Sequence, residues 1–401
     1  MSAVDRIGRP LRVCYPFIGN NVGGSHLSTL LLVKNLDRSR VEPCVVLHEE
    51  GLLSGYMREQ KMTYELVAIP GFFRPPYWSL SNVLALAAQT WRLAAFLRKR
   101  GIDIVHANDV RTHFGWTLAT RLTGTKLVWH QRTASFGSST IKLFLAKLAQ
   151  QVVCISHYTA STLPQSLGSR ARIVSNPFDT GFAELDRQAA RQNVLKQLAL
   201  DPETRIVGFF GNLVHQKRPA TFLRTAAKLI EGGNRPLSFL MFGTERNNAQ
   251  AELGRLAEAL NIGGRVHFMG FQTPIEPWMA GCDLMIATGV DDGLGRSLVE
   301  AMISGTPVVA ADSGGHCEVI EDGRTGWLAT ADDPDALAAA AGRVLDDPGL
   351  AQATVQRAQA QALARYSVQR HVSEMTAIYL ETLGRCRKGS PGYPLTGEPL
   401  S

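Results

Sequence analysis

The stretch DLMIATGVDDGLGRSLVEAMISGTPVVAA, residues 283–311, contains the pattern that decides the fold. A short apolar run is followed by a polar loop with two glycines, a helical run that begins near Ser297, and a second short apolar run. Short apolar runs that alternate with helical runs are typical of parallel strands covered on both faces. The stretch therefore predicts a strand, loop, helix and strand of a parallel sheet.

The same alternation occurs in two series along the chain. The first contains LRVCYPF, PCVVLHE, DIVHAND, KLVWH, QVVCIS and ARIVSN, and the second contains RIVGFFGN, LSFLMFG, RVHFMGF, DLMIAT and PVVAA. A chain of 401 residues with 45% apolar content is also too long for one compact core. We predict two Rossmann-like α/β domains, residues 1–180 and 181–365, that face each other across a cleft. A helix over 366–388 is expected to return to the N-terminal domain, and the tail 389–401 to be disordered.

The net charge of +7 comes from the first half of the chain. Residues 1–180 hold 21 basic and 10 acidic residues, whereas residues 181–401 hold 21 and 25. A basic half predicts an anionic partner, such as a membrane surface, a phospholipid or an acidic glycan. Nucleic acid is not expected, because no helix-turn-helix, finger or RNA-binding aromatic pattern is present.

Cysteine usage and apolar runs bear on the compartment. The six cysteines are scattered without Cys-x-x-Cys or zinc-type spacing, which favours a reducing cytosol and no metal site. The start of the sequence has no apolar run before a cleavage site, so we expect no secretion signal. The longest apolar run, residues 80–97, contains Asn82, Gln89 and Arg92 and is expected to be a buried or interfacial helix.

The loop between the first strand and the helix of residues 283–311 is a candidate binding site. Gly293 and Gly295, on either side of Leu294, let a ligand approach the backbone amides at the start of the helix. Glu300 lies one turn inside that helix, where its carboxylate could accept hydrogen bonds from the vicinal hydroxyls of a ribose. Asp292 lies at the mouth of the loop and could orient a sugar. The alternative is an acidic loop that merely favours a helix N-terminus.

The run GTPVVAADSGGHCEVIEDGRTGWLA, residues 305–329, follows directly and adds a Gly-Gly turn and a DG-x-x-G segment. Together these motifs resemble the donor-sugar site of retaining glycosyltransferases of family 4, which have the GT-B fold, and the resemblance covers residues 11–383. In that family seven residues separate two acids, as they separate Asp292 from Glu300 here. The resemblance implies that Asp292 holds the transferred sugar and Glu300 the ribose. This chain departs from the family by having Asp rather than Glu at 292 and Thr288 near the usual Pro-Ser.

A second constellation is GFFGNLVHQKRPATFL, residues 208–223. It resembles the family segment whose Arg and Lys neutralise the donor diphosphate. Lys217 matches the Lys, whereas Asn212 stands where Arg is usual and Arg218 where Gly is usual. A fixed cation is needed because negative charge develops on the diphosphate as the glycosidic bond breaks. The alternative is a solvated pair of basic residues at a helix start.

Three further features of the sequence resemble parts of the family site. Gly23 and Gly24 lie in IGNNVGGSHL, ahead of a helix with Ser25 as its expected N-cap, and the spacing is not that of a dinucleotide loop. The resemblance implies that this loop faces the donor phosphates. His130 ends the run KLVWH, like the family histidine near the transferred sugar, although a lone histidine is more often structural. Phe271 is a candidate wall for the nucleotide base, with a place in the core as the alternative.

The segment 71–100 combines aromatic residues with a basic end. The resemblance implies that the N-terminal domain takes the acceptor and often rests on the membrane. We therefore expect this segment to contact anionic lipid or a lipid-linked acceptor, with an ordinary amphipathic core helix as the alternative. The basic residues concerned are Arg74, Arg92, Arg98, Lys99 and Arg100.

These observations lead to one expected function and two alternatives. The chain is expected to be a retaining, metal-independent glycosyltransferase of the hexosyltransferase type, with a nucleotide-diphosphate sugar as co-substrate and no cofactor. Its acceptor would be a glycan or lipid-linked hydroxyl in cell-surface polysaccharide or glycolipid synthesis. It would act in the cytoplasm, at the inner face of the membrane. A phosphorylase or epimerase on the same fold, and a non-catalytic nucleotide-sugar binder, remain open, as do the base and sugar of the donor.

Overall fold

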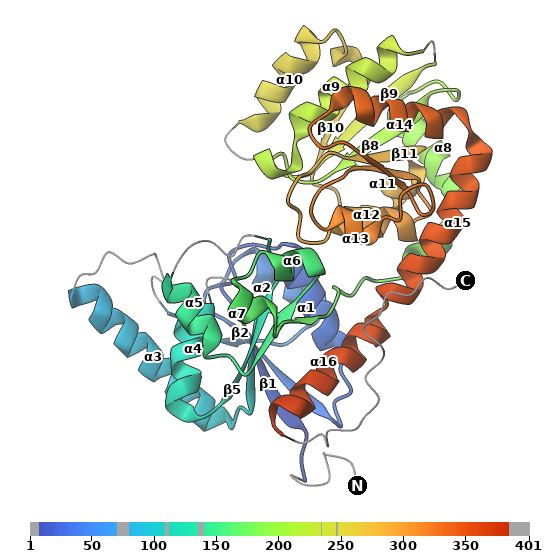
Figure 1. The fold of residues 1–401 in the computed structure, drawn as a ribbon. Helices are drawn as coiled ribbons and strands as arrows, with labels where there is room; N and C mark the ends of the chain where they lie inside the picture. The colour runs from blue at the N-terminus through green and yellow to red at the C-terminus, as the bar shows by residue number, and fades with distance from the viewer. Residues whose placement is uncertain are drawn as a thin grey trace.

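The computed structural model describes residues 8–69, 80–108, 112–134, 140–233, 235–245 and 248–384, with backbone only at 80–83 and 140–142. The segment 71–79, which includes Arg74, and the tail 389–401 lie outside the described residues. Figure 1 shows two α/β domains, one above the other, each built on one sheet.

The N-terminal domain contains a seven-stranded sheet in the order β3-β2-β1-β4-β5-β6-β7, and its described pairings are parallel. The strands are β1 (Leu11–Phe17), β2 (Val41–Leu47), β3 (Glu65–Leu66), β4 (Ile104–Ala107), β5 (Lys126–Gln131), β6 (Gln151–Cys154) and β7 (Arg172–Ile173). The helices are α1 (Gly24–Asn35), α2 (Leu52–Glu59), α3 (Leu80–Arg100), α4 (His113–Thr123), α5 (Thr140–Lys147), α6 (His157–Ser161) and α7 (Gln165–Gly168). Two apolar clusters, one on each face, bury this sheet, which is why its strands read as continuous apolar runs.

The C-terminal domain contains a six-stranded parallel sheet in the order β10-β9-β8-β11-β12-β13. The strands are β8 (Arg205–Phe210), β9 (Leu237–Phe242), β10 (Val266–Gly270), β11 (Leu284–Ala287), β12 (Val308–Ala311) and β13 (Trp327–Ala329). The helices are α8 (Arg187–Gln197), α9 (Pro219–Glu231), α10 (Ala249–Ala259), α11 (Glu276–Gly281), α12 (Arg296–Ile303), α13 (His316–Val319) and α14 (Pro334–Asp346), with short 3-10 turns η2 (Gly181–Glu184), η3 (His215–Lys217) and η4 (Gly263–Arg265). Apolar clusters again cover both faces of the sheet.

The expected fold class, two Rossmann-like domains, is confirmed, and each of the eleven predicted apolar runs contains a strand. Strands β3 and β13 were not predicted, because two and three residues are too few to form a recognisable run. The expected N-cap at Ser25 is wrong. Helix α1 begins at Gly24 with Gly23 as its cap, and the Gly23 amide donates to His26 Nδ1 at 3.0 Å, so Ser25 already lies in the first turn.

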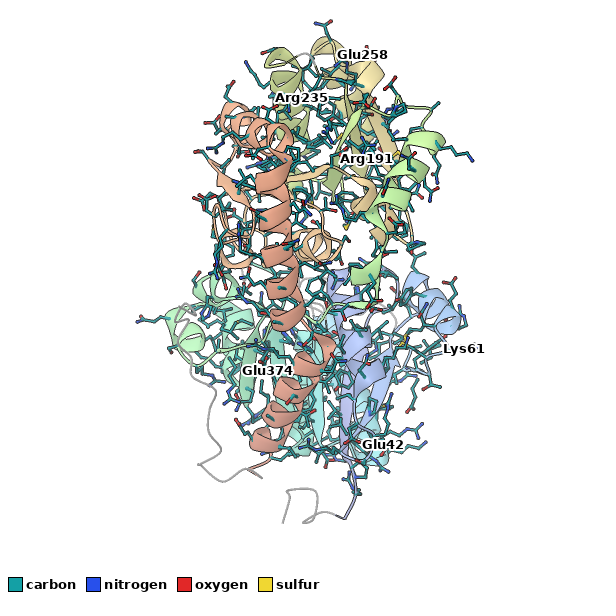
Figure 2. All side chains as sticks on the ribbon, turned by 90° about the vertical axis from the view of Figure 1, so that its right-hand side faces the viewer. Glu42, Lys61, Arg191, Arg235, Glu258 and Glu374 are labelled. Atoms are coloured by element: carbon teal, nitrogen blue, oxygen red, sulfur yellow. The ribbon has the colours of Figure 1, made fainter. Side chains whose placement is uncertain are left out.

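The last two helices connect the domains. Helix α15 (Pro348–Arg365) packs against α12 in the C-terminal domain, and α16 (Val368–Thr382) packs against α1 in the N-terminal domain. Figure 2 shows the two helices running along both domains, with Glu374 labelled on α16. Met375, Ile378 and Tyr379 of α16 are buried in the core of the N-terminal domain. The chain therefore crosses between the domains twice.

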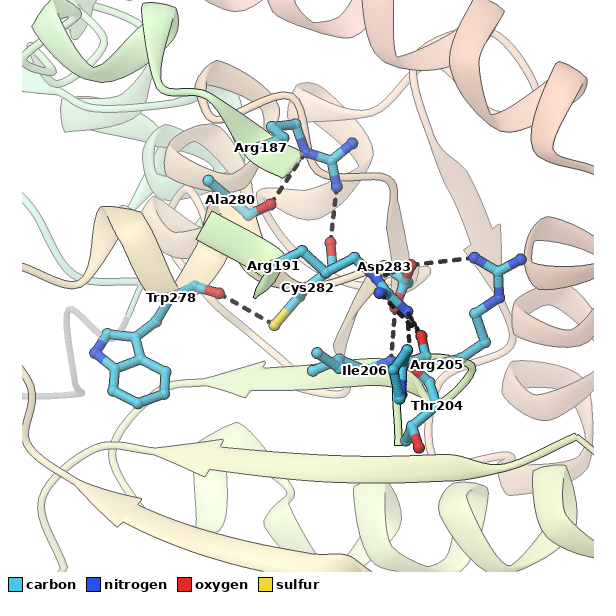
Figure 3. A network of polar contacts seen from close by, with 10 residues as sticks. Arg187, Arg191, Thr204, Arg205, Ile206, Trp278, Ala280, Cys282 and Asp283 are labelled. Atoms are coloured by element: carbon cyan, nitrogen blue, oxygen red, sulfur yellow. Dashed lines mark hydrogen bonds and ion pairs between the residues drawn. The ribbon is translucent and has the colours of Figure 1, made fainter. Parts of the chain in front are cut away.

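A partly buried acid, Asp283, fixes the start of the C-terminal domain (Figure 3). Asp283, just before β11, accepts from the guanidinium groups of Arg191 and Arg205 and from the Ile206 amide at 2.8 Å. Arg187 donates to the carbonyls of Ala280 and Cys282 at 3.2 and 2.7 Å. These bonds hold α8 against the amino ends of β8 and β11. The carboxyl ends of the same strands remain for the site.

Candidate active site

The loops after β8 and β11 are tied together at the carboxyl edge of the C-terminal sheet. The Thr288 hydroxyl lies 2.9 Å from the carbonyl oxygens of both Lys217 and Arg218. The Val290 amide donates to the Gln216 carbonyl at 2.9 Å. Thr288 thus anchors the turn that carries Lys217. This anchoring brings Lys217 to the loop of Asp292.

Lys217 and Asp292 form a close ion pair at this edge. Lys217 Nζ lies 2.5 Å from Asp292 Oδ2, and the two side chains are 27% and 20% exposed. His316 Nε2 approaches the same oxygen at 3.4 Å, while His316 Nδ1 faces the Ala311 carbonyl at 3.1 Å. Burial acts to raise the pKa of Asp292, but the hydrogen bond with His316 and the charge of Lys217 outweigh it and hold that pKa well below its usual range. The cluster therefore keeps an ionised carboxylate beside a cation at the mouth of the loop.

Glu300 lies where the two domains meet. Its Oε1 accepts from Arg296 Nη2 at 2.6 Å, and Arg296 Nη1 donates to the Ser28 hydroxyl of α1 at 2.8 Å. The guanidinium carbon of Arg296 also lies 4.5 Å from the centre of the Phe178 ring, a cation–π contact. A Cβ atom on Gly24 would come within 2.6 Å of Arg296 Cδ, so a larger residue there would displace the Arg296 side chain. The structure therefore brings Gly24 and Glu300 together through Arg296.

The loop of Asp292 also touches the N-terminal domain directly. The Gly293 carbonyl accepts from the hydroxyls of Ser156 and Thr159, the latter at 3.2 Å. The Tyr158 hydroxyl donates to Asp291 at 2.6 Å. The two domains are thus in contact along this loop, and Gly293 presents its carbonyl to a partner within the protein.

A second interdomain contact lies beside it. The Glu318 carboxylate of α13 accepts from the backbone amides of His157 and Tyr158, at 2.8 and 2.5 Å. These amides are among the unpaired donors at the start of α6, where a negative charge is favourable. An acid of the C-terminal domain therefore caps a helix of the N-terminal domain and holds the two domains together at this edge.

Several residues that the sequence predicted for the diphosphate lie apart from Lys217 and Asp292. Arg218 does not point to Asp292: its Nε donates to Asp332 at 3.1 Å and its Nη1 lies beside His215. The Asn212 side-chain oxygen accepts from the amide and hydroxyl of Thr244, at 3.2 and 2.9 Å. Both residues therefore brace neighbouring loops, and Lys217 is the predicted cation that reaches the cluster.

The remaining predicted residues fall in different surroundings. Phe271 is 69% exposed, so the alternative of a place in the core is wrong for this residue. Leu294 is buried at the domain boundary. Gly295 has a φ of +81°, which favours glycine, and a Cβ there would meet the His316 ring at 2.8 Å. Gly23 caps α1 close to Gly24.

His130 lies at the end of a buried hydrogen-bonded chain. The hydroxyls of Tyr15 and Tyr379 are 3.0 Å apart, the Tyr379 hydroxyl lies 2.6 Å from His106 Nδ1, and His106 Nε2 lies 2.9 Å from His130 Nδ1. Burial lowers the pKa of His130 well below its usual range, and the charge of Arg132 adds to this effect. His130 is therefore neutral.

The direction in which these hydrogen bonds donate decides which nitrogen of His130 carries the proton. If each group donates toward His130, the Tyr15 hydroxyl has Tyr379 as its acceptor and His130 Nε2 carries a proton. That direction leaves one buried group unpaired, the His130 Nε2 proton. If each group donates the other way, both the Tyr15 hydroxyl proton and His130 Nε2 lack a partner among the described residues, and each unmade buried bond costs about 1–3 kcal/mol. The first direction is therefore favoured, and His130 presents a donor at Nε2.

Buried histidines predict that the protein loses stability in acid. Burial lowers the pKa of His371 to about 3; the charge of Arg132 adds to the shift, and the hydrogen bond to the Ser175 carbonyl opposes it. Between the unfolded pKa near 6.5 and about 3, the unfolded chain binds a proton that the folded chain does not, so stability falls as pH falls. We expect His371→Gln to reduce the slope of unfolding free energy against pH by up to about 1.4 kcal/mol per pH unit between pH 4 and 6. Urea unfolding at several pH values measures this slope, and equal slopes for both proteins would contradict the assignment.

Two surface cavities lie away from these residues. One of about 410 Å³ is lined by Arg12, Glu42 and Arg100 at the amino ends of the N-terminal strands. The other, of about 300 Å³, is lined by Arg187, Asp283 and neighbouring residues. Ligands of open α/β sheets bind at the carboxyl ends of strands, so we place the candidate site at Lys217, Asp292 and Glu300 instead.

The two halves of the chain match the two domain models of one family. Residues 22–182 match the model described as Glycosyltransferase Family 4, and residues 204–347 match the model described as Glycosyl transferases group 1. The chain belongs to glycosyltransferase family 4. The resemblance expected from the sequence is thereby confirmed. The first match ends and the second begins between the last strand of the N-terminal sheet and the first strand of the C-terminal sheet.

Curated members of this family align with about half of the chain. The lipopolysaccharide core biosynthesis mannosyltransferase LpsB of Rhizobium meliloti is 29% identical over 59% of this chain and 67% of its own length. The corresponding LpcC of Rhizobium leguminosarum bv. viciae is 30% identical over 46% of this chain and 53% of its own. A D-inositol 3-phosphate glycosyltransferase of Catenulispora acidiphila is 34% identical over 42% of this chain and 40% of its own length. The alignments thus span between two fifths and two thirds of these relatives.

Solved structures share the whole fold of this family 4 chain. Alr3699/HepE of Anabaena, crystallised with UDP and glucose, superposes with a TM-score of 0.78 at 22% identity, over 94% of this chain and all of that one. A glycosyltransferase of Rickettsia africae superposes with a TM-score of 0.82 at 16% identity, over 94% of this chain and all of that one. The two-domain arrangement is therefore the GT-B fold, as expected.

The site also contains residues that the sequence reasoning missed. His316 and Arg296 contact the predicted acids Asp292 and Glu300, and Glu318 joins the domains. The spacing of Arg296 and Glu300, four residues apart on a helix, was a usable signal for their pair. His316 and Glu318 follow the Gly-Gly turn, and no sequence pattern indicated which residues they contact.

Proposed function

We propose that the protein transfers a sugar from a nucleotide-diphosphate sugar to an acceptor hydroxyl, with retention of the anomeric configuration and without a metal ion. The observation that carries this proposal is the Lys217–Asp292 pair beside Glu300, on loops at the carboxyl ends of strands and in contact with the other domain. Membership of family 4 and the crystal structures of HepE in complex with UDP and glucose and with UDP-glucose support it.

In this proposal the roles follow from charge and position. Glu300 accepts from the ribose hydroxyls after releasing Arg296. Lys217 stabilises the diphosphate, because negative charge grows there as the bond to the sugar breaks. Asp292 orients a hydroxyl of the sugar, and His130 donates its Nε2 proton to another. Contact between the domains excludes water from the reaction.

The chemical step that we propose takes place on one face of the sugar. The acceptor oxygen bonds to the anomeric carbon as the bond from that carbon to the diphosphate oxygen breaks. The electron pair of the broken bond stays on the diphosphate, and the acceptor proton passes to a diphosphate oxygen. The residues near the loop of Asp292 hold the reactants in place, and no side chain is required as a nucleophile.

Product analysis tests this function against its alternatives. The protein would be incubated with UDP-, GDP- and ADP-sugars, first alone and then with glycan or lipid-linked acceptors. We expect release of the nucleoside diphosphate with one donor, faster with an acceptor. A changed sugar on an intact nucleotide would instead identify an epimerase. Binding in a thermal-shift screen without any turnover would identify a binder.

The acceptor proposed is a glycan or glycolipid of the cell surface. LpsB and LpcC are named for lipopolysaccharide core biosynthesis, and the N-terminal half of this chain is basic. We propose that the enzyme works in the cytoplasm at the inner face of the membrane. Among the described helices, none combines the length and apolar character needed to span a bilayer, so the contact proposed is a peripheral one.

Helix α3 provides the surface for that contact (Figure 1). Trp91 and Leu84 on α3, and Phe144 on α5, are 63%, 62% and 61% exposed. The same helix ends in exposed basic residues, among which Arg98 donates to the Leu122 carbonyl and Arg100 pairs with Glu65. Exposed aromatic and basic side chains on one helix are typical of a surface that lies on anionic lipid.

Vesicle flotation is expected to show binding to phosphatidylglycerol-containing vesicles that falls at high salt. The triple variant Trp91→Ala, Arg92→Gln, Lys99→Gln should lose most of this binding, because it removes an aromatic anchor and two charges, each worth about 1 kcal/mol near the surface. Arg255→Gln with Arg265→Gln, on the exposed far side of the C-terminal domain, is the charge-matched control. Undiminished flotation of the triple variant would rule this surface out.

A further inference from the structure

Arg132 is a buried arginine with an incomplete set of partners. It follows β5 and is 8% exposed. Its Nε donates to the Asn108 side-chain oxygen at 2.9 Å, and its Nη1 donates to the Asn176 side-chain oxygen. Its Nη2 is buried and has no hydrogen-bond partner. Two of the three guanidinium nitrogens are therefore held by side-chain amides, and the third is left without a partner.

The charge of Arg132 has no acid to balance it among the described residues. The titratable groups that interact with it are His106, His130, His371, Tyr379 and Arg296. Burial lowers the pKa of Arg132 to about 9, Tyr379 opposes the shift and Arg296 adds to it. The guanidinium is still charged at neutral pH. A buried charge without a counter-charge is costly, so an anion placed beside it is stabilised.

Other described cations around the cleft are already paired. Lys217 pairs with Asp292, Arg296 with Glu300, and Arg218 with Asp332. Each of these ion pairs has a net charge near zero before a substrate arrives. Arg132 differs because both of its partners are uncharged amides. It therefore offers a full positive charge to a ligand.

Arg132 also lies at the right edge of the domain. Its neighbours Asn108 and Asn176 follow β4 and β7, at the carboxyl ends of the N-terminal strands. Its carbonyl oxygen lies 3.4 Å from where a Cβ on Gly293 would be, next to Asp292. His130 is two residues earlier, near the end of β5, and its Nε2 is also buried without a partner.

We propose that Arg132 binds a phosphate group of a substrate on the N-terminal side of the cleft, with His130 as a second donor. Asn108 and Asn176 position the guanidinium so that Nη2 is left to donate to the ligand, and a guanidinium suits phosphate recognition. The inference rests on the proposed function, since it names a substrate group of the same cleft. The phosphate is either that of the donor diphosphate or one carried by the acceptor. Separation of the domains moves Gly293 away and admits it.

An isosteric change at Asn108 separates this proposal from a purely structural role. Asn108→Asp keeps the oxygen that accepts from Arg132 and adds a negative charge beside it. We expect the melting temperature to stay level or rise, because the buried charge gains a partner, while the Kd for the phosphate ligand rises about 10-fold or more. Arg132→Gln should raise the Kd for the phosphate ligand by a similar factor. If Arg132→Gln does not fold, Asn108→Asp alone tests the proposal. Asn193→Asp, on exposed α8, is the control for the charge change.

Calorimetric titration with three probes identifies the source of the phosphate. The probes are the nucleoside diphosphate found by the donor screen, its nucleoside, and inorganic phosphate. Weaker diphosphate binding with unchanged nucleoside binding would assign Arg132 to the donor. Unchanged diphosphate binding with loss of inorganic phosphate binding would assign it to a phosphorylated acceptor. Wild-type affinity of both variants for both phosphate probes would overturn the proposal. Failure of the wild type to bind any nucleoside diphosphate would count against the proposed function, while the inorganic phosphate titration would still test Arg132.

Discussion

Replacing Lys217 with alanine is expected to lower kcat for sugar transfer by about 10²- to 10³-fold. Lys217 Nζ lies 2.5 Å from Asp292 Oδ2, so its charge is fixed at the loop where the diphosphate of the donor is proposed to lie. A fixed cation stabilises the leaving diphosphate more in the transition state than in the bound substrate, so the loss should appear mainly in kcat rather than in KM. Initial rates of nucleoside diphosphate release over a range of donor concentrations measure both constants.

The neighbouring Arg218→Ala variant is the matched control. Arg218 donates to Asp332 and not to the cluster, so its loss should change kcat by no more than a few fold. Lys217→Ala also leaves Asp292 with His316 as its one described partner, which should cost about 1–3 kcal/mol of unfolding free energy. Urea unfolding checks that the variant remains folded. Equal losses of kcat for the two variants would show that Lys217 has no special role.

Replacing Glu300 with glutamine should raise KM for the donor by about 10- to 100-fold. Its carboxylate is proposed to accept from the two ribose hydroxyls, and hydrogen bonds to a charged group are worth about 1.5–3 kcal/mol each. Wild-type protein should therefore prefer a ribose donor over its 2′-deoxyribose analogue, and the variant should lose that preference. The ratio of kcat/KM for the two donors is the measurement.

The ribose preference separates recognition from structure. Glu300 also holds Arg296, which contacts α1, so a general loss of activity could follow from altered packing of the domains. Altered packing alone would lower kcat/KM equally for the ribose donor and its 2′-deoxyribose analogue, so the preference for ribose would remain. That outcome would refute the ribose role of Glu300. Glu258→Gln on α10, labelled in Figure 2 at the far end of the C-terminal domain, is the matched control and should leave both rates unchanged.

The two sheets could be predicted because their strands are buried on both faces. A strand such as β11, with four buried residues, must be apolar throughout, and that requirement is visible in one sequence. The loop of Asp292 and the helix of Glu300 were visible for the same reason, because the strand before the loop and the helix after it are both regular. Strands β3 and β13 gave no such signal.

The contacts of the site could not be predicted, because they join residues far apart in the chain. Arg218 adopts a positive φ of 52° and turns toward Asp332, and nothing local to the sequence specifies either feature. His130 was placed at a strand end correctly, but its ring stacks against His371 of α16, more than two hundred residues later. Arg132 was not singled out, because its lack of an acid partner is a property of three distant loops.

A crystal structure with the nucleoside diphosphate identified by the donor screen tests the central claim most directly. The account predicts ribose hydroxyls within hydrogen-bonding distance of Glu300, a diphosphate against Lys217 Nζ, and Arg296 displaced from Glu300. A nucleotide bound elsewhere, or one bound in the cleft with its ribose away from Glu300 and its diphosphate away from Lys217, would contradict it.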